Sequence, residues 1–249
     1  MYSQILYEVA DRVAVITLNR PEKLNVFSGS MANEIYDAFD RSWKDNDVGA
    51  IVLTGAGRGF CGGMDLQALG TPEGRKLVAD SPLLQKFPLE NWNSPKPTIC
   101  AFNGTAVGVG ITMAVSFDIR IGSENSKYSV PFIKLGLVPG FGGSRMLQDL
   151  VGRSRALRLL QTGEMIDAHE ALRIGLIDKL VPAGEALNAA REMAKTMASY
   201  DPFVLGLLKR SVNFSASHPD IEEVLANEMK ISNELLAKRS PTIPAKGAH

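Results

Sequence analysis

Two glycine-rich segments constrain the fold most, because each follows a short apolar run of the kind found in buried strands. Ala50–Thr54 precedes the glycines of Gly55–Gly63, and Thr98–Phe102 precedes a second loop that starts at Asn103. Continuous runs rich in β-branched residues are typical of parallel strands covered on both faces. Each glycine loop then leads into residues that favour a helix. This repeated order of strand, loop and helix predicts an α/β fold.

The rest of the chain extends this pattern and then becomes helical. Further strands are predicted at Ile5–Val9, Val13–Leu18, Ile119–Ile121 and Tyr128–Val130, and a helix from Ser28 to Trp43. After about Gly143 nearly every segment has helical periodicity. We therefore predict a core over residues 1–195 and a helical subdomain over residues 196–249. Residues 70–97, which contain several Pro and Gly, predict a mobile, variable segment over a site.

Composition excludes several classes of function. The chain has 249 residues, 45% of them hydrophobic, and its 27 basic residues balance 27 acidic ones. Without a basic stripe we expect no nucleic-acid partner. No signal-like segment and no apolar run of ~18 residues occur, so we expect no export and no membrane partner. Cys61 and Cys100 are too few for a disulfide framework, and we expect a cytoplasmic location. His169, His218 and His249 are too scattered to predict a metal site.

Two glycine-containing segments partly resemble known loop motifs. Gly57–Gly62 fits the pattern G-x-G-x-x-G of dinucleotide-binding loops. That motif requires a helix directly afterwards and then a second strand, but Gly70, Pro72 and Gly74 interrupt the following stretch. Gly142–Ser144 does not fit the G-x-S-x-G turn of serine hydrolases. Neither motif therefore has its required context.

The two loops taken together favour a different interpretation. Gly59–Leu66 and Asn103–Ile111 each place a helix start after a strand. A helix start has free N–H groups and the positive end of the helix dipole. Two such starts side by side could direct two N–H donors at one oxygen, which is the arrangement of an oxyanion hole. The alternative is that both loops are only tight turns between strand and helix.

Several motifs, in order along nearly the whole chain, resemble the crotonase (enoyl-CoA hydratase/isomerase) superfamily. They are Asn19–Asn25, Ile51–Gly55, Gly59–Leu66, Asn103–Asp118, Leu135–Gly140, Gly163 and Ala168 with Gly175–Asp178, and Ala237–Pro241. The resemblance implies a crotonase fold, which is a spiral of ββα repeats with a C-terminal helical trimerisation region. It implies a homotrimer or hexamer acting on an acyl-CoA thioester through an enolate. It implies no cofactor, because coenzyme A is part of the substrate.

The resemblance also assigns roles to particular residues. Met64 and Val109 match the positions whose backbone N–H groups form the oxyanion hole, and Gly108 and Gly110 flank the second of them. The CoA-binding positions match the residues Lys23, Leu24, Asp65 and Leu66. Asp65 could equally serve as the cap of a short helix.

Departures from the family pattern bear directly on the reaction. The two glutamates that handle water in hydratases fall at Thr112 and Phe132 here, and an acid used by some isomerases falls at Gly140. Phe cannot transfer a proton, and Thr is too weak an acid or base for water addition. Each missing group would have contributed a factor of ~10²–10⁴. We therefore expect the two-glutamate hydration mechanism to be absent.

Three kinds of function stay open. The first is an enolate reaction without a protein base, such as decarboxylation of a malonyl- or glutaconyl-type thioester. The second is isomerisation, hydrolysis or hydration with other residues, for which the variable segment offers acids and bases that could equally be surface charges. These are Lys76, Asp80, Lys86 and Glu90. The third is a catalytically silent acyl-CoA-binding protein. Cys61, within the first loop, is expected to be a buried inert thiol.

Overall fold

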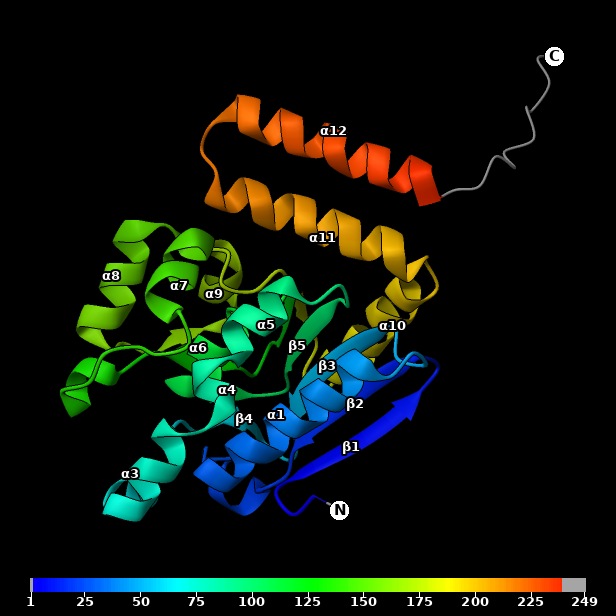
Figure 1. Cartoon of the computed structure of the whole chain (residues 1–249). Helices are drawn as coiled ribbons and strands as arrows, with labels where there is room; N and C mark the ends of the chain where they lie inside the picture. The colour runs from blue at the N-terminus through cyan, green and yellow to red at the C-terminus, as the bar shows by residue number, and fades with distance from the viewer. Residues whose placement is uncertain (1, 239–249) are drawn as a thin grey trace.

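The computed structural model describes residues 2–238, which contain two β-sheets surrounded by helices (Figure 1). The larger sheet has six strands in the order β1-β2-β3-β5-β7-β10, and the smaller has four in the order β4-β6-β8-β9. Among the strand pairs of residues 2–238, only β1–β2 and β8–β9 are antiparallel. The strands span Ile5–Ala10 (β1), Val13–Leu18 (β2), Ala50–Gly55 (β3), Gly59–Cys61 (β4), Thr98–Phe102 (β5), Thr105–Val107 (β6), Ile119–Ser123 (β7), Lys127–Ser129 (β8), Ile166–Asp167 (β9) and Lys179–Val181 (β10).

The chain winds as a spiral, because each turn places one strand in each sheet. β3, β5 and β7 lie in the larger sheet, and the strand that follows each of them, β4, β6 and β8, lies in the smaller one. Parallel neighbours end at the same edge of a sheet. Residues that follow β4 and β6 therefore meet at one edge, and the predicted spiral of ββα repeats is confirmed.

Helices cover both faces of the larger sheet. The helices before the C-terminal pair are Gly29–Lys44 (α1), Leu66–Leu69 (α2), Pro72–Ala79 (α3), Pro82–Gln85 (α4), Phe87–Asn93 (α5), Val109–Ala114 (α6), Gly143–Val151 (α7), Arg153–Thr162 (α8), Ala168–Arg173 (α9) and Ala186–Ala198 (α10), with 3₁₀ turns at Pro21–Lys23 and Phe132–Leu135. α1 begins at Ser28, whose hydroxyl accepts a hydrogen bond from the Met31 amide. On the opposite face α10 packs through Ala186, Ala190, Ala194 and Ala198. Their small side chains let this helix lie close to the sheet.

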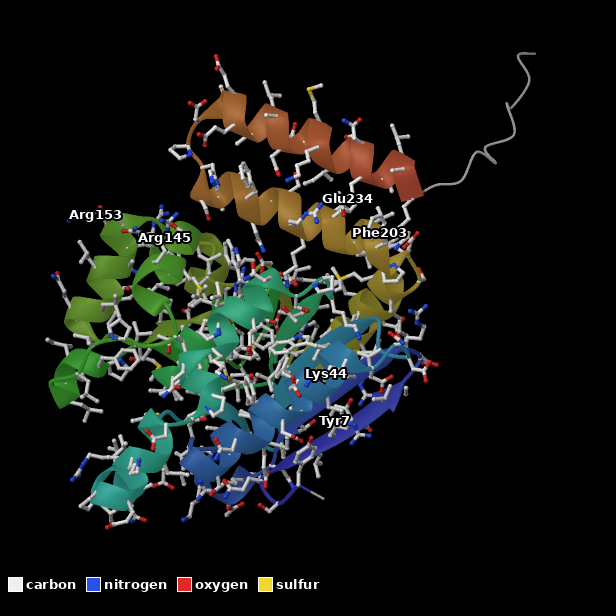
Figure 2. The ribbon with its side chains drawn as sticks, in the orientation of Figure 1. Tyr7, Lys44, Arg145, Arg153, Phe203 and Glu234 are labelled. Atoms are coloured by element: carbon white, nitrogen blue, oxygen red, sulfur yellow. The ribbon has the colours of Figure 1, made fainter. Side chains whose placement is uncertain are left out.

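The last two helices, α11 (Pro202–Ser217) and α12 (Ile221–Lys238), form a hairpin at the edge of the molecule (Figure 1). An ion pair between Arg210 and Glu234 joins them, and the Lys238 ammonium lies 3.7 Å from the ring centroid of Phe203. Figure 2 labels Phe203 and Glu234, one residue from each helix of the hairpin. The predicted domain boundary after residue 195 falls inside α10, and the division into two domains stays a prediction. Residues 239–249, which end the predicted subdomain, lie outside the described residues. They include most of the Ala237–Pro241 motif.

The structure corrects three local expectations. The short strands β4 and β6 lie within segments that were predicted as loop. Residues 70–97 contain α3, α4 and α5, because each begins with a proline in its first turn, a position that favours helix initiation. The region after Gly143 includes the short strands β9 and β10. Between residues 2 and 238, no helix is long and apolar enough to cross a membrane.

Candidate active site

The two glycine loops lie side by side because β4 and β6 pair in parallel. Cys61 is in register with Ala106, and Met64 and Val109 each follow three residues later. Gly63 packs closely against the second loop, since a Cβ atom at this position would lie 3.6 Å from the carbonyl oxygen of Val107. The geometry therefore brings the predicted oxyanion positions to the same edge of the smaller sheet.

The first amide, that of Met64, is oriented by a parallel bridge to Phe27. The Phe27 N–H donates to the Gly63 carbonyl at 2.7 Å, and its carbonyl accepts from the Asp65 N–H at 2.9 Å. In a parallel ladder, the residue that lies between two neighbours bonded in this way turns its own N–H and C=O to the opposite side of its strand. The Met64 N–H therefore points away from Phe27.

The second amide, that of Val109, is the first of α6. The preceding Gly108 has φ 55° and ψ −113°, a conformation that disfavours any residue with a Cβ atom. Its own N–H donates to the Ser129 carbonyl at 2.8 Å, which fixes the loop to β8. The first N–H groups of a helix have no acceptor within the helix. Within residues 2–238, neither the Val109 nor the Met64 N–H has a hydrogen-bond acceptor.

Sequence comparison decides the family to which this arrangement belongs. The sequence profile described as "Enoyl-CoA hydratase/isomerase" matches residues 8–247. The chain belongs to the enoyl-CoA hydratase/isomerase family. It is 37% identical over 237 residues to a short-chain-enoyl-CoA hydratase of Clostridium acetobutylicum, covering 93% of this chain and 89% of that one. It is 34% identical over 266 residues to a 1,2-epoxyphenylacetyl-CoA isomerase of Escherichia coli, covering 99% and 100%.

Solved structures of this family have the same fold. An enoyl-CoA hydratase from Bacillus anthracis superposes with a TM-score of 0.88 at 28% identity, covering 95% of this chain and 92% of that one. An enoyl-CoA hydratase subunit from Geobacillus kaustophilus gives 0.87 at 30% identity, covering 95% and 91%. The predicted crotonase fold is therefore confirmed.

The three positions at which the family resemblance expects acids lie around the start of α6. The Phe132 ring is 3.9 Å from where a Cβ atom of Gly108 would lie. A Cβ atom at Gly143 would lie 2.8 Å from the Thr112 methyl carbon, and the Gly143 N–H donates to the Gly140 carbonyl at 2.9 Å. The Thr112 hydroxyl is buried and has no partner among the described residues. None of these three residues carries a group that titrates near neutral pH.

The predicted CoA-binding residues lie within the first loop, as Asp65 and Leu66 do, or in the turn of Lys23 and Leu24 that contacts it. Lys23 ends a 3₁₀ turn, and Leu24 follows in the left-handed conformation with φ 53°. The Leu24 carbonyl accepts from the Gly62 N–H at 2.7 Å, so this turn contacts the first glycine loop directly. Lys23 and Leu66 are exposed. Asp65 caps α2 by accepting from the Ala68 N–H at 3.3 Å, as its alternative interpretation expected.

Sequence reasoning missed the side chains that hold these loops together. The Asn25 side chain is fully buried, accepts from the Arg20 N–H at 2.8 Å and donates to the Ala56 and Gly59 carbonyls at 2.9 Å each. Arg20 forms an ion pair with Asp65 at 3.4 Å. Arg20 and Asn25 both belong to the Asn19–Asn25 motif. Their place in that motif was the available signal, but the sequence alone does not show what their side chains contact.

The acids and bases of the variable segment are engaged elsewhere. Lys76 pairs with Asp80 one turn along on the exposed side of α3. Glu90 accepts a hydrogen bond from the Tyr36 hydroxyl of α1 at 2.8 Å, and burial with this carboxylate raises the pKa of Tyr36 to about 12. Lys86 is exposed. In the part of the chain that the structure describes, no hydrogen bond or ion pair joins these four side chains to either glycine loop.

Cys61 lies at the end of β4, within the first loop, and its chemistry is that of a buried thiol. Its side chain is fully buried, and burial raises its pKa to about 11, although a hydrogen bond with the Gly63 backbone partly opposes the shift. Its sulfur lies 3.9 Å from the Gly63 carbonyl oxygen. A nucleophilic cysteine needs a lowered pKa. These features support an inert packing role.

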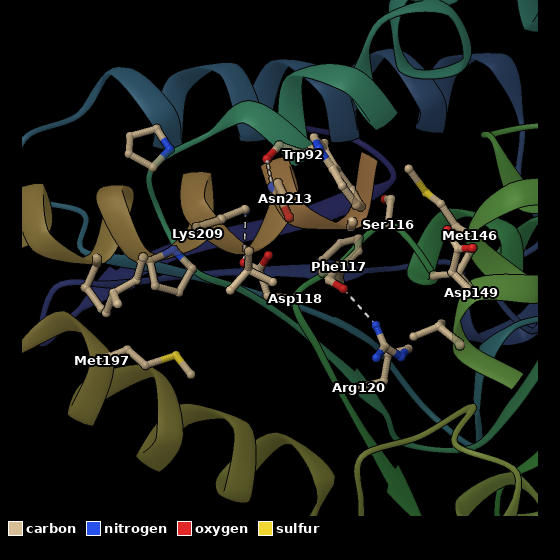
Figure 3. Close-up of a pocket in the computed structure, with 18 of the residues that line it drawn as sticks. Trp92, Ser116, Phe117, Asp118, Arg120, Met146, Asp149, Met197, Lys209 and Asn213 are labelled. Atoms are coloured by element: carbon tan, nitrogen blue, oxygen red, sulfur yellow. Dashed lines mark hydrogen bonds and ion pairs between the residues drawn. The ribbon is translucent and has the colours of Figure 1, made fainter. Parts of the chain in front are cut away.

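A separate cavity of about 670 Å³ lies between α11 and the core (Figure 3). Its walls are mainly apolar, and its charged groups are paired. Lys209 binds Asp118 at 3.0 Å, and Arg120 binds Asp178 at 2.8 Å. Burial lowers the pKa of Lys209, and the Asp118 carboxylate partly restores it. None of the predicted site residues lines this cavity, so it is distinct from the two loops.

Proposed function

We propose that the Met64 and Val109 amides bind the thioester oxygen of an acyl-CoA and stabilise its enolate. The observation that supports this most is the Phe27 bridge, which turns the Met64 N–H away from Phe27. The register of β4 and β6 supports it further, because Met64 and Val109 each follow three residues after the paired Cys61 and Ala106. Neither amide has an acceptor within residues 2–238. Loss of one donor from such a pair typically costs ~2.7–4 kcal/mol. The pair could therefore carry much of an enolate reaction.

The reaction that these surroundings support best is decarboxylation of a malonyl- or glutaconyl-type thioester. The C–C bond to the carboxylate breaks, CO₂ leaves, and the electron pair of that bond forms the enolate, whose negative charge lies on the thioester oxygen. A proton from water then forms a new C–H bond in place of the broken C–C bond. No protein base takes part, which suits a site whose Thr112, Phe132 and Gly140 carry no acid. Phe132 would also keep water from the departing carboxylate, which strengthens N–H···O⁻ contacts.

Isomerisation is the second candidate, because an isomerase is similar to this chain over its entire length. Isomerisation would need a proton carrier other than Thr112, Phe132 and Gly140. A genuine hydratase using other residues and a catalytically silent acyl-CoA binder complete the alternatives. The acyl carrier is proposed to be coenzyme A, as in the names of the relatives.

A thioester panel tests these functions directly. Malonyl-, methylmalonyl-, glutaconyl-, 3-enoyl- and crotonyl-CoA are incubated with the protein, and products are followed by mass spectrometry. We expect loss of CO₂ from a carboxylated thioester and little hydration of crotonyl-CoA. Fast crotonyl-CoA hydration would overturn the argument from the missing acids. Binding without any product would favour the silent binder.

We also propose that the chain assembles as a homotrimer or hexamer through its C-terminal helices. Ile221, Leu225, Met229 and Leu236 are each more than half exposed on one side of α12. Two further apolar residues of α12, Val224 and Leu235, are partly covered, whereas Ile221, Leu225 and Met229 are not. An exposed apolar row on a helix is typical of a protein interface. The free cysteines Cys61 and Cys100 fit the expected reducing, cytoplasmic setting.

A further inference from the structure

The turn formed by residues 20–27 contacts the first glycine loop at several points. In the middle of the turn the Leu24 carbonyl accepts from the Gly62 N–H at 2.7 Å. At the end of the turn the Phe27 backbone bonds to the residues on both sides of Met64. The predicted CoA-binding residues Lys23 and Leu24 are therefore part of the same segment that orients the Met64 amide.

One side chain closes this segment onto the loop. Arg20 donates from Nη1 to the Val26 carbonyl at 3.0 Å, and Nη1 and Nη2 each lie 3.4 Å from Asp65 Oδ2. The side chains of Arg20 and Asp65 are only 16% and 14% exposed. A guanidinium that bonds to two groups at once fixes their relative position, which a flexible ammonium does less well. Arg20 therefore links the turn, next to Phe27, to the residue that follows Met64.

The anchor of the turn is independent of this link. Asn25 adopts a left-handed conformation with φ 53°, and its buried side chain bonds to Arg20, Ala56 and Gly59. Non-glycine residues in this region of φ are strained and persist where the surroundings hold them. Leu24 is in the same region of φ. The turn is thus held in one conformation, and a shift within it would be passed on to the Met64 amide.

We infer that Arg20 is a positioning residue that couples occupancy of the CoA-binding turn to the geometry of the Met64 amide. This inference rests on the proposed acyl-CoA function. Binding energy from a remote part of a substrate can be used to stabilise the transition state, so a truncated substrate loses rate as well as affinity. The nucleotide part of CoA, held near Lys23, would in this way improve enolate binding at Met64.

Ligands that differ in one feature each allow the coupling to be measured without knowing the natural acyl group. Acetoacetyl-CoA forms an enolate readily, butyryl-CoA does not, and acetoacetyl-pantetheine lacks the nucleotide. Affinities are measured by calorimetry, and bound enolate by its ultraviolet absorbance. The variants are Arg20→Gln, which removes the charge, and Arg20→Lys, which keeps it. Asp65→Asn breaks the ion pair but retains an oxygen that can cap α2.

The matched control is Arg173→Gln, because Arg173 also forms an ion pair with a carboxylate, Glu170, but on the exposed surface of α9. We expect Arg20→Gln to lower the affinity for acetoacetyl-CoA about tenfold and to reduce the bound enolate, as for a misplaced oxyanion donor. Asp65→Asn should act in the same direction, and Arg20→Lys should recover part of the loss. The affinity of Arg20→Gln for butyryl-CoA should remain close to that of the wild type. Arg173→Gln should bind both CoA thioesters as the wild type does.

The wild type should bind acetoacetyl-CoA more tightly than acetoacetyl-pantetheine, and this difference in affinity should be smaller in Arg20→Gln. An equal loss for butyryl- and acetoacetyl-CoA would overturn the inference, because it would show a purely structural or ground-state role. So would an equal loss for the CoA and pantetheine ligands, or no loss at all. Failure of the wild-type protein to bind either CoA thioester would instead overturn the proposed function itself.

Discussion

A Cβ atom at position 110 would lie 2.8 Å from the Cβ atom of Cys61. Real Cβ atoms do not come so close, so glycine at 110 lets α6 begin directly against the first loop. The contact joins Cys61 at the end of β4 to the first turn of α6, which follows the paired strand β6. The spacing of the two proposed oxyanion donors depends on this close approach.

Gly110→Ala tests that dependence. A glycine-to-alanine change inside a helix ordinarily stabilises by roughly 0.5–1 kcal/mol, but here the added methyl group overpacks against Cys61. Overpacking typically costs about 1–3 kcal/mol. We expect the free energy of unfolding, measured with denaturant, to fall and turnover to drop with it. A variant more stable than the wild type would contradict the close contact.

Gly108→Ala separates backbone conformation from packing. There is room for its Cβ atom, since the nearest atom outside its neighbours, in the Phe132 ring, would be 3.9 Å away, but the residue has φ 55°. Alanine would relax this dihedral and rotate the peptide that carries the Val109 N–H. Turnover should fall by about 10²-fold, as when one oxyanion donor is removed. Gly184→Ala is the control, because it has φ 87° and open space but lies before α10. Equal activity losses in both variants would contradict a specific role for Gly108.

Much of this site was predictable from sequence, and the reason differs between its parts. The loops were identified because strand, glycine and helix signals are local. β4 and β6 were missed because three-residue strands such as Gly59–Cys61 form through pairing between distant segments. Arg20 and Phe27 act through contacts with Asp65 and Gly63, and no local pattern encodes such contacts. The helices of residues 70–97 are not evident from sequence, because the glycines and prolines of this segment also signal turns. The structure shows that prolines such as Pro72 lie in the first turn of a helix.

Stability at alkaline pH should depend on Cys61. Burial raises the pKa of its thiol to about 11 in the folded state, whereas an exposed thiol has a pKa of about 8.5. Below a pH of about 8.5 the Cys61 thiol keeps its proton in both the folded and the unfolded chain, so its contribution to the free energy of unfolding is fully present. As the pH rises towards 11, only the unfolded chain loses its proton, so the free energy of unfolding falls, by an amount on the order of 3 kcal/mol.

Cys61→Ala should remove this contribution. Denaturant unfolding at a series of pH values, in the presence of a reductant, gives the slope for each protein. The other groups that titrate in this range, including Tyr36, are common to both proteins and cancel in the difference. The variant should therefore lose less stability between neutral and alkaline pH. Identical slopes would show that Cys61 is accessible to water in the folded state.

Introducing a carboxyl group at Phe132 should create hydration activity. The ring lies beside Gly108, and Phe132→Glu would place a proton carrier near the proposed site of the enolate. Hydration of crotonyl-CoA should be about 10²-fold faster in Phe132→Glu than in Phe132→Gln, which has nearly the same shape but cannot titrate. Equal rates in the two variants would mean that position 132 does not face the reacting carbons.

The exposed side of α12 should determine assembly. Met229→Glu places a charge within the apolar row that includes Leu225 and Leu236, so burying this surface against another copy would become unfavourable. Sedimentation should show a shift from the oligomer to smaller species. Glu223→Lys changes the charge on a different side of the same helix and should leave the mass unchanged. An oligomer that survives Met229→Glu would place the interface elsewhere.

The winding of the chain also limits how many donors this edge can supply. Cys61, Ala106 and Tyr128 stand in register across β4, β6 and β8. Counting three residues onward from each gives Met64, Val109 and Pro131. Proline has no N–H, so the third turn of the spiral has nothing to donate from its equivalent place. The third strand of the smaller sheet therefore cannot add a backbone donor to the proposed pair from its equivalent position.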